Sequence, residues 1–280
     1  MSKLLTSGDM CHQWTLQLMQ QIQECKTTPG VVGIQVGNLA ASRIYLRKKQ
    51  ELAHKLGMHF QVIQVTTQAE LLARIDQANV DPAIHGIMVQ LPLPAGWPTQ
   101  QILDTIVPTK DVDGLTSASP FLAATPKGVL HFLERRQIHT QGRHVVILGK
   151  SKIVGRPLAS QLADETTWGA TVTQCDRHTP RPLLHALVAQ ADVLIVATGK
   201  HHLIDGSFAF QPHCIIIDVG FHRIRQPDGS VRPEGDVDLD AVQDKIQAIT
   251  AIPGCVGPLT CLALMANVVA VARHGGFHVL

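Results

Sequence analysis

The sequence predicts an α/β protein with parallel sheets, built as two α/β halves with a cleft between them. Short apolar, β-branched runs alternate with segments of helical periodicity, the pattern of repeated βαβ units. The chain has 280 residues, enough for two medium-sized domains. One of these runs ends at a glycine-containing loop that leads into a proline-initiated helix, as in a ligand-binding βα turn.

The first half is expected to alternate helices with strands up to about residue 106. The expected helices are 10–25, 40–56, 68–78 and 100–106, and the expected strands are 31–36, 60–65 and 84–90. The run Leu91-Pro92-Leu93-Pro94 ends the last of these strands, because proline cannot join a strand ladder. Residues 110–125 look like a connection, so the two halves meet near residue 125.

The second half repeats the same alternation. The expected helices are 126–136, a helix after Pro157, 182–190, a short helix before 248 and 259–273, and the expected strands are 144–148, 171–175, 193–197, 214–218 and 248–250. Asp228-Gly229 predicts the turn of a hairpin between Phe221 and Arg232.

The central βα turn runs from His144 to Pro157. We interpret it as the first turn of a Rossmann-like dinucleotide-binding domain, since free N–H groups and the helix dipole there favour an anion. Its two glycines, Gly149 and Gly155, match neither the G-x-G-x-x-G fingerprint nor a P-loop. An ordinary strand-loop-helix corner is the alternative.

The composition excludes several functional classes. A net charge of +2 gives no indication of nucleic-acid binding. The six cysteines form no C-x-x-C pair, so we expect a reduced, cytoplasmic setting. We expect no signal peptide and no apolar run long enough to span a bilayer. The fifteen histidines are scattered, with His201-His202 as the only adjacent pair, so no metal site is expected.

Unusual residues follow several predicted strands, which places them at one edge of a parallel sheet and favours a ligand cleft. These segments are Gly37-Asn38, Gln90-Leu91-Pro92, Gly149-Lys150-Ser151, Asp176-Arg177, Thr198-Gly199 and 253–258.

Four side chains in the first half could carry chemistry. Tyr45 and Lys49 lie four residues apart, so they share a helix face on which the ring could cover a flat heterocycle while the amine reaches a reacting atom. Gln90 could orient that amine, and Asp113 could accept two N–H groups from an amidine-like edge. The alternatives are a solvated basic helix, a capping glutamine and a turn aspartate.

Taken in order, a series of short motifs resembles the methylenetetrahydrofolate dehydrogenase/cyclohydrolase family over nearly the whole chain. The motifs are Val36-Gly37 with Ala41-Ser42, Tyr45 to Lys49, Val89 to Pro94, Lys110 to Gly114, Thr125 to Gly128, Gly149 to Pro157, Ile217 to Gly220, Gly235 to Val237, and Pro253-Gly254 with Val256 to Pro258. Each motif is short, but their order and spacing are specific.

The resemblance implies two reactions in one cleft. NADP, or NAD as the alternative, accepts a hydride from 5,10-methylenetetrahydrofolate, and the 5,10-methenyltetrahydrofolate formed is hydrolysed to 10-formyltetrahydrofolate. It also implies a folate-binding catalytic domain at 1–125, completed by the C-terminal helix 259–280, and an NAD(P)-binding domain at 126–258. The expected protein is a cytoplasmic homodimer that binds tetrahydrofolate derivatives and has no nucleic-acid or membrane partner.

The same resemblance assigns roles to residues. Lys49 is implied as the catalytic lysine, Gln90 as the residue that tunes it, Asp113 as the holder of the pterin edge and Tyr45 as packing on the folate. The other expected substrate contacts are Val89, Leu91, Pro253, Gly254, Val256 and Gly257. The expected cofactor contacts are Gly149, Lys150, Ser151, Gly155, Arg177, Thr198, Gly199 and Phe221.

Three departures from the family pattern leave an alternative open. Cys255 stands where a glycine is usual, Ala40-Ala41 stands where Pro-Ala is usual, and the segment 115–124 is short, with Ala124 in place of a cysteine. A non-catalytic or single-activity paralogue that binds nucleotide or folate as a regulator is therefore the alternative.

Cofactor choice depends on the residues after strand 171–175. An acidic residue there, such as Asp176, selects the ribose 2′-hydroxyl of NAD, whereas a nearby arginine, such as Arg177, accommodates the 2′-phosphate of NADP. Lys150 and Arg177 outnumber Asp176, which favours NADP.

Overall fold

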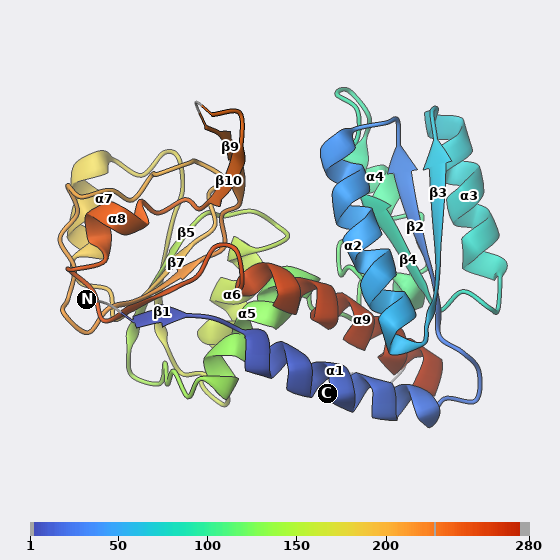
Figure 1. The fold of residues 1–280 in the computed structure, drawn as a ribbon, viewed down its shortest axis with the longest axis horizontal. Coiled ribbons are helices and arrows are strands. Elements are labelled where there is room, and N and C mark those ends of the chain that lie inside the picture. The colour runs from blue at the N-terminus through green and yellow to red at the C-terminus, as the bar shows by residue number, and fades with distance from the viewer. Residues whose placement is uncertain (1–2, 227, 275–280) are drawn as a thin grey trace. The chain divides into compact units, whose positions relative to one another are not determined.

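The computed structural model describes residues 3–226 and 228–274, which divide into two compact units. Unit 1 comprises Met1–Met10 and Thr125–Thr260, and unit 2 comprises Cys11–Ala124 and Cys261–Leu280. Each unit contains its own parallel sheet with helices packed against it, which confirms the predicted α/β class (Figure 1). Positions 275–280 of the expected C-terminal helix lie outside the described residues.

Unit 1 contains a six-stranded sheet in the order β1-β11-β8-β7-β5-β6, in which every neighbouring pair is parallel. The strands are β1 (Lys3–Leu5), β5 (His144–Leu148), β6 (Thr171–Cys175), β7 (Val193–Val196), β8 (Ile215–Asp218) and β11 (Ala248–Thr250). The helices are α5 (Ala124–Arg135), α6 (Gly155–Leu162), α7 (Arg181–Val188) and α8 (Leu239–Val242). Only β1 has no counterpart in the sequence prediction.

The central strand β5 forms because its β-branched run can be buried on both faces of the sheet. Val145, Val146 and Ile147 have no exposed surface, and Leu148 is 1% exposed. Val146 and Leu148 point into a cluster that also contains Val188 of α7. Because the strand is buried on both faces, the position of its carboxyl end, and of the loop that follows, is fixed.

The predicted hairpin is confirmed as β9 (His222–Arg225) paired antiparallel with β10 (Val231–Glu234). Gly229 at its tip has a φ of 82°, a left-handed conformation that favours glycine. The Gln226 N–H donates to the Ser230 carbonyl at 2.8 Å, which closes the turn. The hairpin carries Glu234 back towards the sheet.

Unit 2 contains a three-stranded parallel sheet in the order β3-β2-β4. The strands are β2 (Gly30–Val36), β3 (His59–Val65) and β4 (Gly86–Gln90), and the helices are α1 (Gly8–Gln23), α2 (Ala40–Leu56), α3 (Gln68–Val80) and α4 (Thr99–Leu103), with a 3₁₀ turn at Pro108–Lys110. Ile34 of β2 packs in one cluster with Leu71 of α3. A Cβ on Gly33 would meet Leu46 of α2 at 2.8 Å, so α2 covers the opposite face.

Both sheets reverse their strand order at one strand, which is β5 in unit 1 and β2 in unit 2. In unit 1 the chain moves from β5 to β6 on one side and then to β7 on the other. In unit 2 it moves from β2 to β3 and then to β4 on the other side. Ligands of open α/β sheets bind beyond the carboxyl ends of strands at such a switch point. The residues after β5 and β7, and after β2 and β4, are therefore the ones to compare with the predicted sites.

The last helix, α9 (Val256–His274), corrects two expectations. It begins at Val256 and not at Leu259. Its window Val256–Arg273 has 18 residues and a mean hydropathy of 1.6, so by length and composition one helix could span a membrane, contrary to the prediction. However, 56% of that window is buried within the protein, and Val268 lies against Gly86 of β4, as expected of a core helix.

Candidate active site

In unit 2, α2 directs Lys49 towards the switch-point strand β4. Leu46, one helical turn before Lys49, is 1% exposed and packs on the sheet, so residue 49 lies above the same face. The Lys49 Nζ lies 3.9 Å from the sulfur of Met88, a buried residue of β4. Tyr45 precedes Lys49 by one turn and is 39% exposed. A half-buried amine therefore lies next to an aromatic ring that is accessible from outside.

Gln90 ends β4 opposite Gln35 of β2. Its Nε2 donates to the Leu91 carbonyl at 2.9 Å, so the amide orientation is fixed as the capping alternative predicts. Its Oε1 is buried and accepts no hydrogen bond from any described residue. A buried acceptor without a donor costs about 1–3 kcal/mol, so this atom is suited to a donor from a ligand. Lys49 donates to Met88 and not to Gln90.

The role of turn aspartate belongs to Asp111 and not to Asp113. The Asp111 carboxylate accepts from the Gly114 N–H at 3.1 Å and from the Thr116 N–H at 2.7 Å. The Asp113 carboxylate is therefore not needed to hold this turn. Burial raises the pKa of the Asp113 carboxyl, the charge of Lys49 opposes that rise, and the charge of Asp111 adds to it. Asp113 is thus a half-buried acid within electrostatic reach of Lys49.

The short segment 115–124 is an internally bonded loop. Gly114 has a φ of 70°, and a Cβ there would meet the Ala123 backbone at 2.7 Å, so the two ends of the loop touch. Ser117 donates to the Asp104 carboxylate through its N–H at 2.7 Å and its hydroxyl at 3.0 Å. Asn267 of α9 donates to the Val112 carbonyl at 2.8 Å. The residues on both sides of Asp113 are therefore held in place, Val112 by Asn267 and Gly114 by Asp111.

Sequence reasoning did not identify Met88 or Cys261 as neighbours of Lys49. Burial raises the pKa of the Cys261 thiol, while the charges of Lys49 and Lys48 lower it, so these groups lie in one electrostatic environment. No local pattern could have indicated this, since α9 meets α2 only through the fold.

In unit 1, the turn after β5 is built on close backbone contacts. A Cβ on Gly149 would lie 2.3 Å from the Ala197 carbonyl oxygen, and one on Gly155 would lie 1.8 Å from the Gly149 oxygen. The Ser151 hydroxyl accepts from the N–H groups of Val154 at 3.1 Å and Gly155 at 3.4 Å. No described residue accepts from the N–H groups of 151–153. The loop that leads into α6 therefore offers donors to an anion.

The residues that follow β6 combine both charges. Lys150 Nζ lies 3.4 Å from Asp176 Oδ2, and the two side chains are 40% and 32% exposed. Arg177 is exposed and donates from Nε to His178 Nε2 at 3.2 Å. The backbone N–H of His178 lowers the pKa of Asp176, and Lys150 lowers it further.

The predicted contacts Thr198 and Gly199 follow β7 at the switch point, but their N–H groups are already occupied. Asp236 Oδ2 accepts from both N–H groups, at 2.7 and 2.8 Å, and from the Thr198 hydroxyl at 2.7 Å. A ligand can meet this loop only through other atoms. Asp236, which the sequence analysis did not select as a site residue, holds the loop in place. Phe221 is 44% exposed after β8.

The predicted substrate contacts of segment 253–258 lie in unit 1, whereas Lys49, Gln90, Asp113, Tyr45, Val89 and Leu91 lie in unit 2. Within unit 1, the Ser7 hydroxyl donates to the Cys255 carbonyl at 2.9 Å and anchors the segment. Cys255 is 1% exposed, so its side chain points into the protein. Pro253 and Gly257 are exposed, and Val256 is buried.

Two family models match this chain, one in each part of the sequence. The catalytic-domain model of tetrahydrofolate dehydrogenase/cyclohydrolase matches residues 6–113, and the NAD(P)-binding-domain model of the same family matches residues 123–275.

The similar proteins agree with these matches. The bifunctional protein FolD 1 of Myxococcus xanthus is 39% identical over 98% of this chain and 99% of its own length. The crystal structure of the bifunctional methylenetetrahydrofolate dehydrogenase/cyclohydrolase FolD from Campylobacter jejuni is 34% identical, with a TM-score of 0.89 over 98% of this chain and all of that one. The Trypanosoma brucei enzyme, solved with NADP and an inhibitor, is 27% identical, with a TM-score of 0.91 over 99% of both chains.

Proposed function

Because this chain belongs to the tetrahydrofolate dehydrogenase/cyclohydrolase family, we propose that it is a bifunctional folate enzyme that uses NADP. It oxidises 5,10-methylenetetrahydrofolate to 5,10-methenyltetrahydrofolate and hydrolyses that product to 10-formyltetrahydrofolate. The grouping of Lys49, Met88, Gln90 and Asp113 around the end of β4 carries this proposal. A non-catalytic regulatory protein would have no need for the half-buried amine of Lys49 beside the desolvated carboxyl group of Asp113.

For the hydrolysis, Lys49 is the residue that assists water. Water forms a bond to the methenyl carbon, the bond from that carbon to N5 breaks, and one proton is released as the formyl group remains on N10. A neutral amine beside the cation can take the proton from the attacking water. The weak sulfur contact with Met88 leaves the Lys49 amine able to exchange partners.

Substrate orientation is assigned to the neighbours of Lys49. Asp113 accepts from the amidine-like edge of the pterin, and the Gln90 Oε1, which has no donor among the described residues, accepts from the substrate or from Lys49. Tyr45 covers the flat ring system. Val89 and Leu91 border Gln90 in the chain, and the segment with Pro253, Gly254, Val256 and Gly257 contributes from unit 1.

The turn after β5 fits a dinucleotide, because its glycines allow close approach and the N–H groups of residues 151–153 have no acceptor among the described residues. Gly149, Lys150, Ser151 and Gly155 would hold the phosphates there. Arg177 would hold the 2′-phosphate. The loop at Thr198 and Gly199, with Phe221, would border the nicotinamide ribose. When bound, NADP supplies the acceptor for the hydride that leaves the methylene carbon.

The proposed domains separate the folate-binding residues from the cofactor-binding residues. Residues 11–125 with the segment 259–280 form the folate-binding domain, and residues 126–258 form the NAD(P)-binding domain. The first ten residues are assigned to the latter, because β1 pairs with β11 in its sheet. A cytoplasmic homodimer that binds tetrahydrofolate derivatives, with no nucleic-acid or membrane partner, completes the proposal.

A coupled absorbance assay tests the function. Purified protein is given 5,10-methylenetetrahydrofolate with NADP or with NAD, and reduced cofactor and methenyl product are followed together. We expect reduced cofactor to accumulate and the methenyl absorbance to decay as hydrolysis proceeds, with the faster rate for NADP. Absence of both signals, combined with measurable nucleotide binding, would favour the regulatory paralogue.

A further inference from the structure

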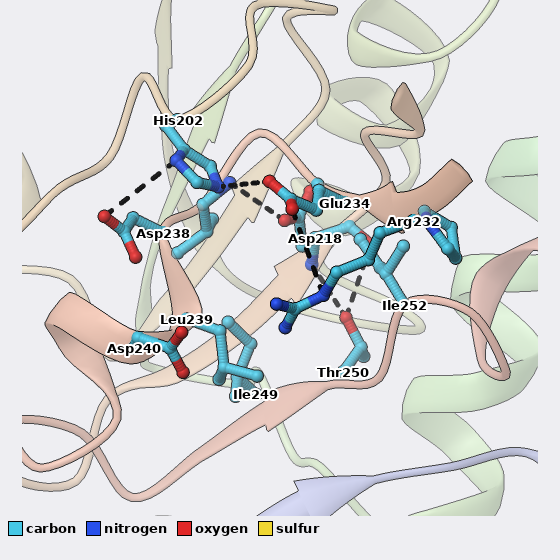
Figure 2. A pocket seen from close by; sticks show the side chains of 13 residues that line it. His202, Asp218, Arg232, Glu234, Asp238, Leu239, Asp240, Ile249, Thr250 and Ile252 are labelled. Carbon is cyan, nitrogen blue, oxygen red and sulfur yellow. Dashed lines mark hydrogen bonds and ion pairs between the residues drawn. The ribbon is translucent and has the colours of Figure 1, made fainter. Parts of the chain in front are cut away.

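A compact group of imidazole and carboxylate side chains lies in unit 1, outside every motif that carries the family resemblance. The Glu234 carboxylate oxygen Oε2 lies 2.7 Å from His201 Nε2 and 3.2 Å from His202 Nε2. All three ligand atoms lie within 4.8 Å of one another. Figure 2 shows His202 and Glu234 facing each other across the rim of a pocket, with Asp238 on the other side of the His202 ring.

The backbone at His202 makes this grouping possible. Consecutive side chains of an extended chain point to opposite sides, which would separate the two rings. His202 instead has a φ of 49°, a left-handed conformation that is uncommon for residues other than glycine. The His201 and His202 rings consequently stack with their centroids 3.7 Å apart. Such conformations cost free energy and are found preferentially at ligand sites.

Both chain segments that carry these side chains are held firmly. Asp236, two residues after Glu234, accepts the N–H groups of Thr198 and Gly199. On the other side of the histidines, the Asp238 N–H donates to the Ile204 carbonyl at 2.8 Å. The two segments are therefore joined before and after the histidine pair. The imidazole nitrogens and the carboxylate oxygen are thus held in position before a ligand binds.

The charges around the three atoms suit a cation. Glu234 places one carboxylate between the two imidazoles, with Oε2 within 3.2 Å of a ring nitrogen of each. A second carboxylate, of Asp238, lies 3.9 Å from His202 Nδ1. Among the described residues, the cation that pairs with Glu234 is Arg232, whose Nε lies 3.9 Å from Glu234 Oε1 and whose side chain is 63% exposed.

We propose that His201, His202 and Glu234 bind one divalent transition-metal ion of the Zn²⁺ type. Two imidazoles and a carboxylate are characteristic ligands for zinc, cobalt, nickel or copper, whereas magnesium and calcium prefer oxygen alone. Ligand atoms about 2.0–2.1 Å from a tetrahedral zinc lie roughly 3.4 Å apart. Glu234 Oε2, at 2.7 and 3.2 Å from the two imidazole nitrogens, would have to move outward by a few tenths of an ångström to admit the ion. The histidines are 34–35% exposed, so an ion can enter and water can complete the coordination. The sequence expectation of no metal site overlooked Glu234, which is 33 residues from His201.

Metal titration of the full chain, prepared without a histidine tag and stripped with chelator, tests the proposal. Zn²⁺ affinity is measured by competition with a chromogenic chelator, and Co²⁺ is used as a spectroscopic probe of the coordination. We expect one tight equivalent of Zn²⁺ and a visible Co²⁺ absorption of tetrahedral intensity. His202→Gln and Glu234→Gln should each weaken Zn²⁺ binding at least about tenfold and abolish the Co²⁺ signal.

His213→Gln is the matched control, since His213 also pairs with a carboxylate, of Asp192 at 2.6 Å, but belongs to no three-ligand group among the described residues. It should leave Zn²⁺ affinity unchanged. Circular dichroism of each variant establishes that the chain is folded, and His201→Gln provides a second ligand variant should one of the others fail to fold. Absence of tight Zn²⁺ binding, or binding that the ligand variants leave unchanged, would overturn the proposal.

Discussion

Lys150 Nζ and Asp176 Oδ2 lie 3.4 Å apart, so the lysine and the carboxylate that would favour opposite cofactors form one ion pair. Both side chains are partly exposed, so the pair itself adds little to stability. Its consequence is electrostatic. The negative charge of Asp176 is compensated by Lys150, which leaves Arg177 as the uncompensated cation next to the expected position of the ribose.

From this arrangement we expect Arg177→Ala to raise the Michaelis constant for NADP by about 10- to 100-fold, the equivalent of one charge-assisted hydrogen bond. The Michaelis constant for NAD should hardly change, because NAD has no 2′-phosphate. Initial rates at varied NADP and NAD give both constants. Arg143→Ala is the control, since Arg143 is exposed and pairs with Asp192.

Asp176→Ala distinguishes the two roles of the carboxylate. Removing it frees Lys150, so the preference for NADP over NAD should increase. If the wild-type enzyme instead turns over NAD better and Asp176→Ala converts it to NADP, then Asp176 faces the ribose and the proposed cofactor is wrong.

Lys49→Met should abolish hydrolysis of 5,10-methenyltetrahydrofolate while leaving nucleotide binding intact, because Lys49 lies in unit 2 and the nucleotide turn lies in unit 1. Methionine preserves much of the length of the side chain and its apolar contact with Met88. Lys48→Met is the matched control, since Lys48 is an exposed neighbour on the same helix. Full cyclohydrolase activity in Lys49→Met would remove this residue from the mechanism.

Asp113→Ala should weaken folate binding far more than cofactor binding, since it removes a charge-assisted pair worth about 1.5–3 kcal/mol. The binding should also depend on pH. Because burial raises the pKa of Asp113, the carboxylate is lost at a higher pH than for an ordinary aspartate, and folate affinity falls as the pH drops through that raised value. Fluorescence titrations across acidic pH would measure this fall, and Asp113→Asn should abolish it. Equal losses for folate and cofactor would indicate a purely structural role.

The strands and helices were predictable where burial imposes a clear sequence pattern, as in the continuous apolar run of β5, whose four inner residues are at most 1% exposed. The strand β1 was not, because three residues give no period, and its place depends on pairing with β11. The motifs indicated Lys49, Gln90 and Asp113 by resemblance. They could not indicate that Asp236 occupies two N–H groups or that Glu234 meets the histidine pair, since both depend on contacts between distant segments. Asp111 holds the turn through local contacts, but the motif contains two aspartates and does not indicate which of them does so.

Asp236→Ala should destabilise unit 1 by about 2–4 kcal/mol, because it leaves the N–H groups of Thr198 and Gly199 without their acceptor. Hydrogen exchange of β7, followed by mass spectrometry at constant pH, would report the loss as faster exchange. Asp240→Ala, at an exposed site in the first turn of α8, should change exchange little. Unchanged protection in Asp236→Ala would show that the loop does not need this carboxylate.

Asp218, at the end of β8, should make the free energy of unfolding of unit 1 depend on pH. Its carboxyl group is 2% exposed and accepts from the N–H groups of Gly220, Asp236 and Val237 at 2.9, 3.2 and 3.0 Å. Burial raises its pKa to about 7, against the opposing effect of these donors. In the unfolded chain the same group titrates near 3.8, so between these values the native state holds a proton that the unfolded state does not. Its stabilising contribution is thus complete below pH 3.8 and is lost as the pH rises through about 7.

The free energy of unfolding should therefore decrease between about pH 5 and pH 7, by up to about 1.4 kcal/mol per pH unit from this group. Trp168 is the only tryptophan of unit 1, so in a Trp14→Phe/Trp97→Phe background its fluorescence reports urea unfolding of that unit. Asp218→Asn cannot ionise and should remove this part of the slope, even though it lowers the stability itself. Asp240→Asn, at an exposed carboxylate, should retain the slope. A slope that persists in Asp218→Asn would assign the pH dependence to another group.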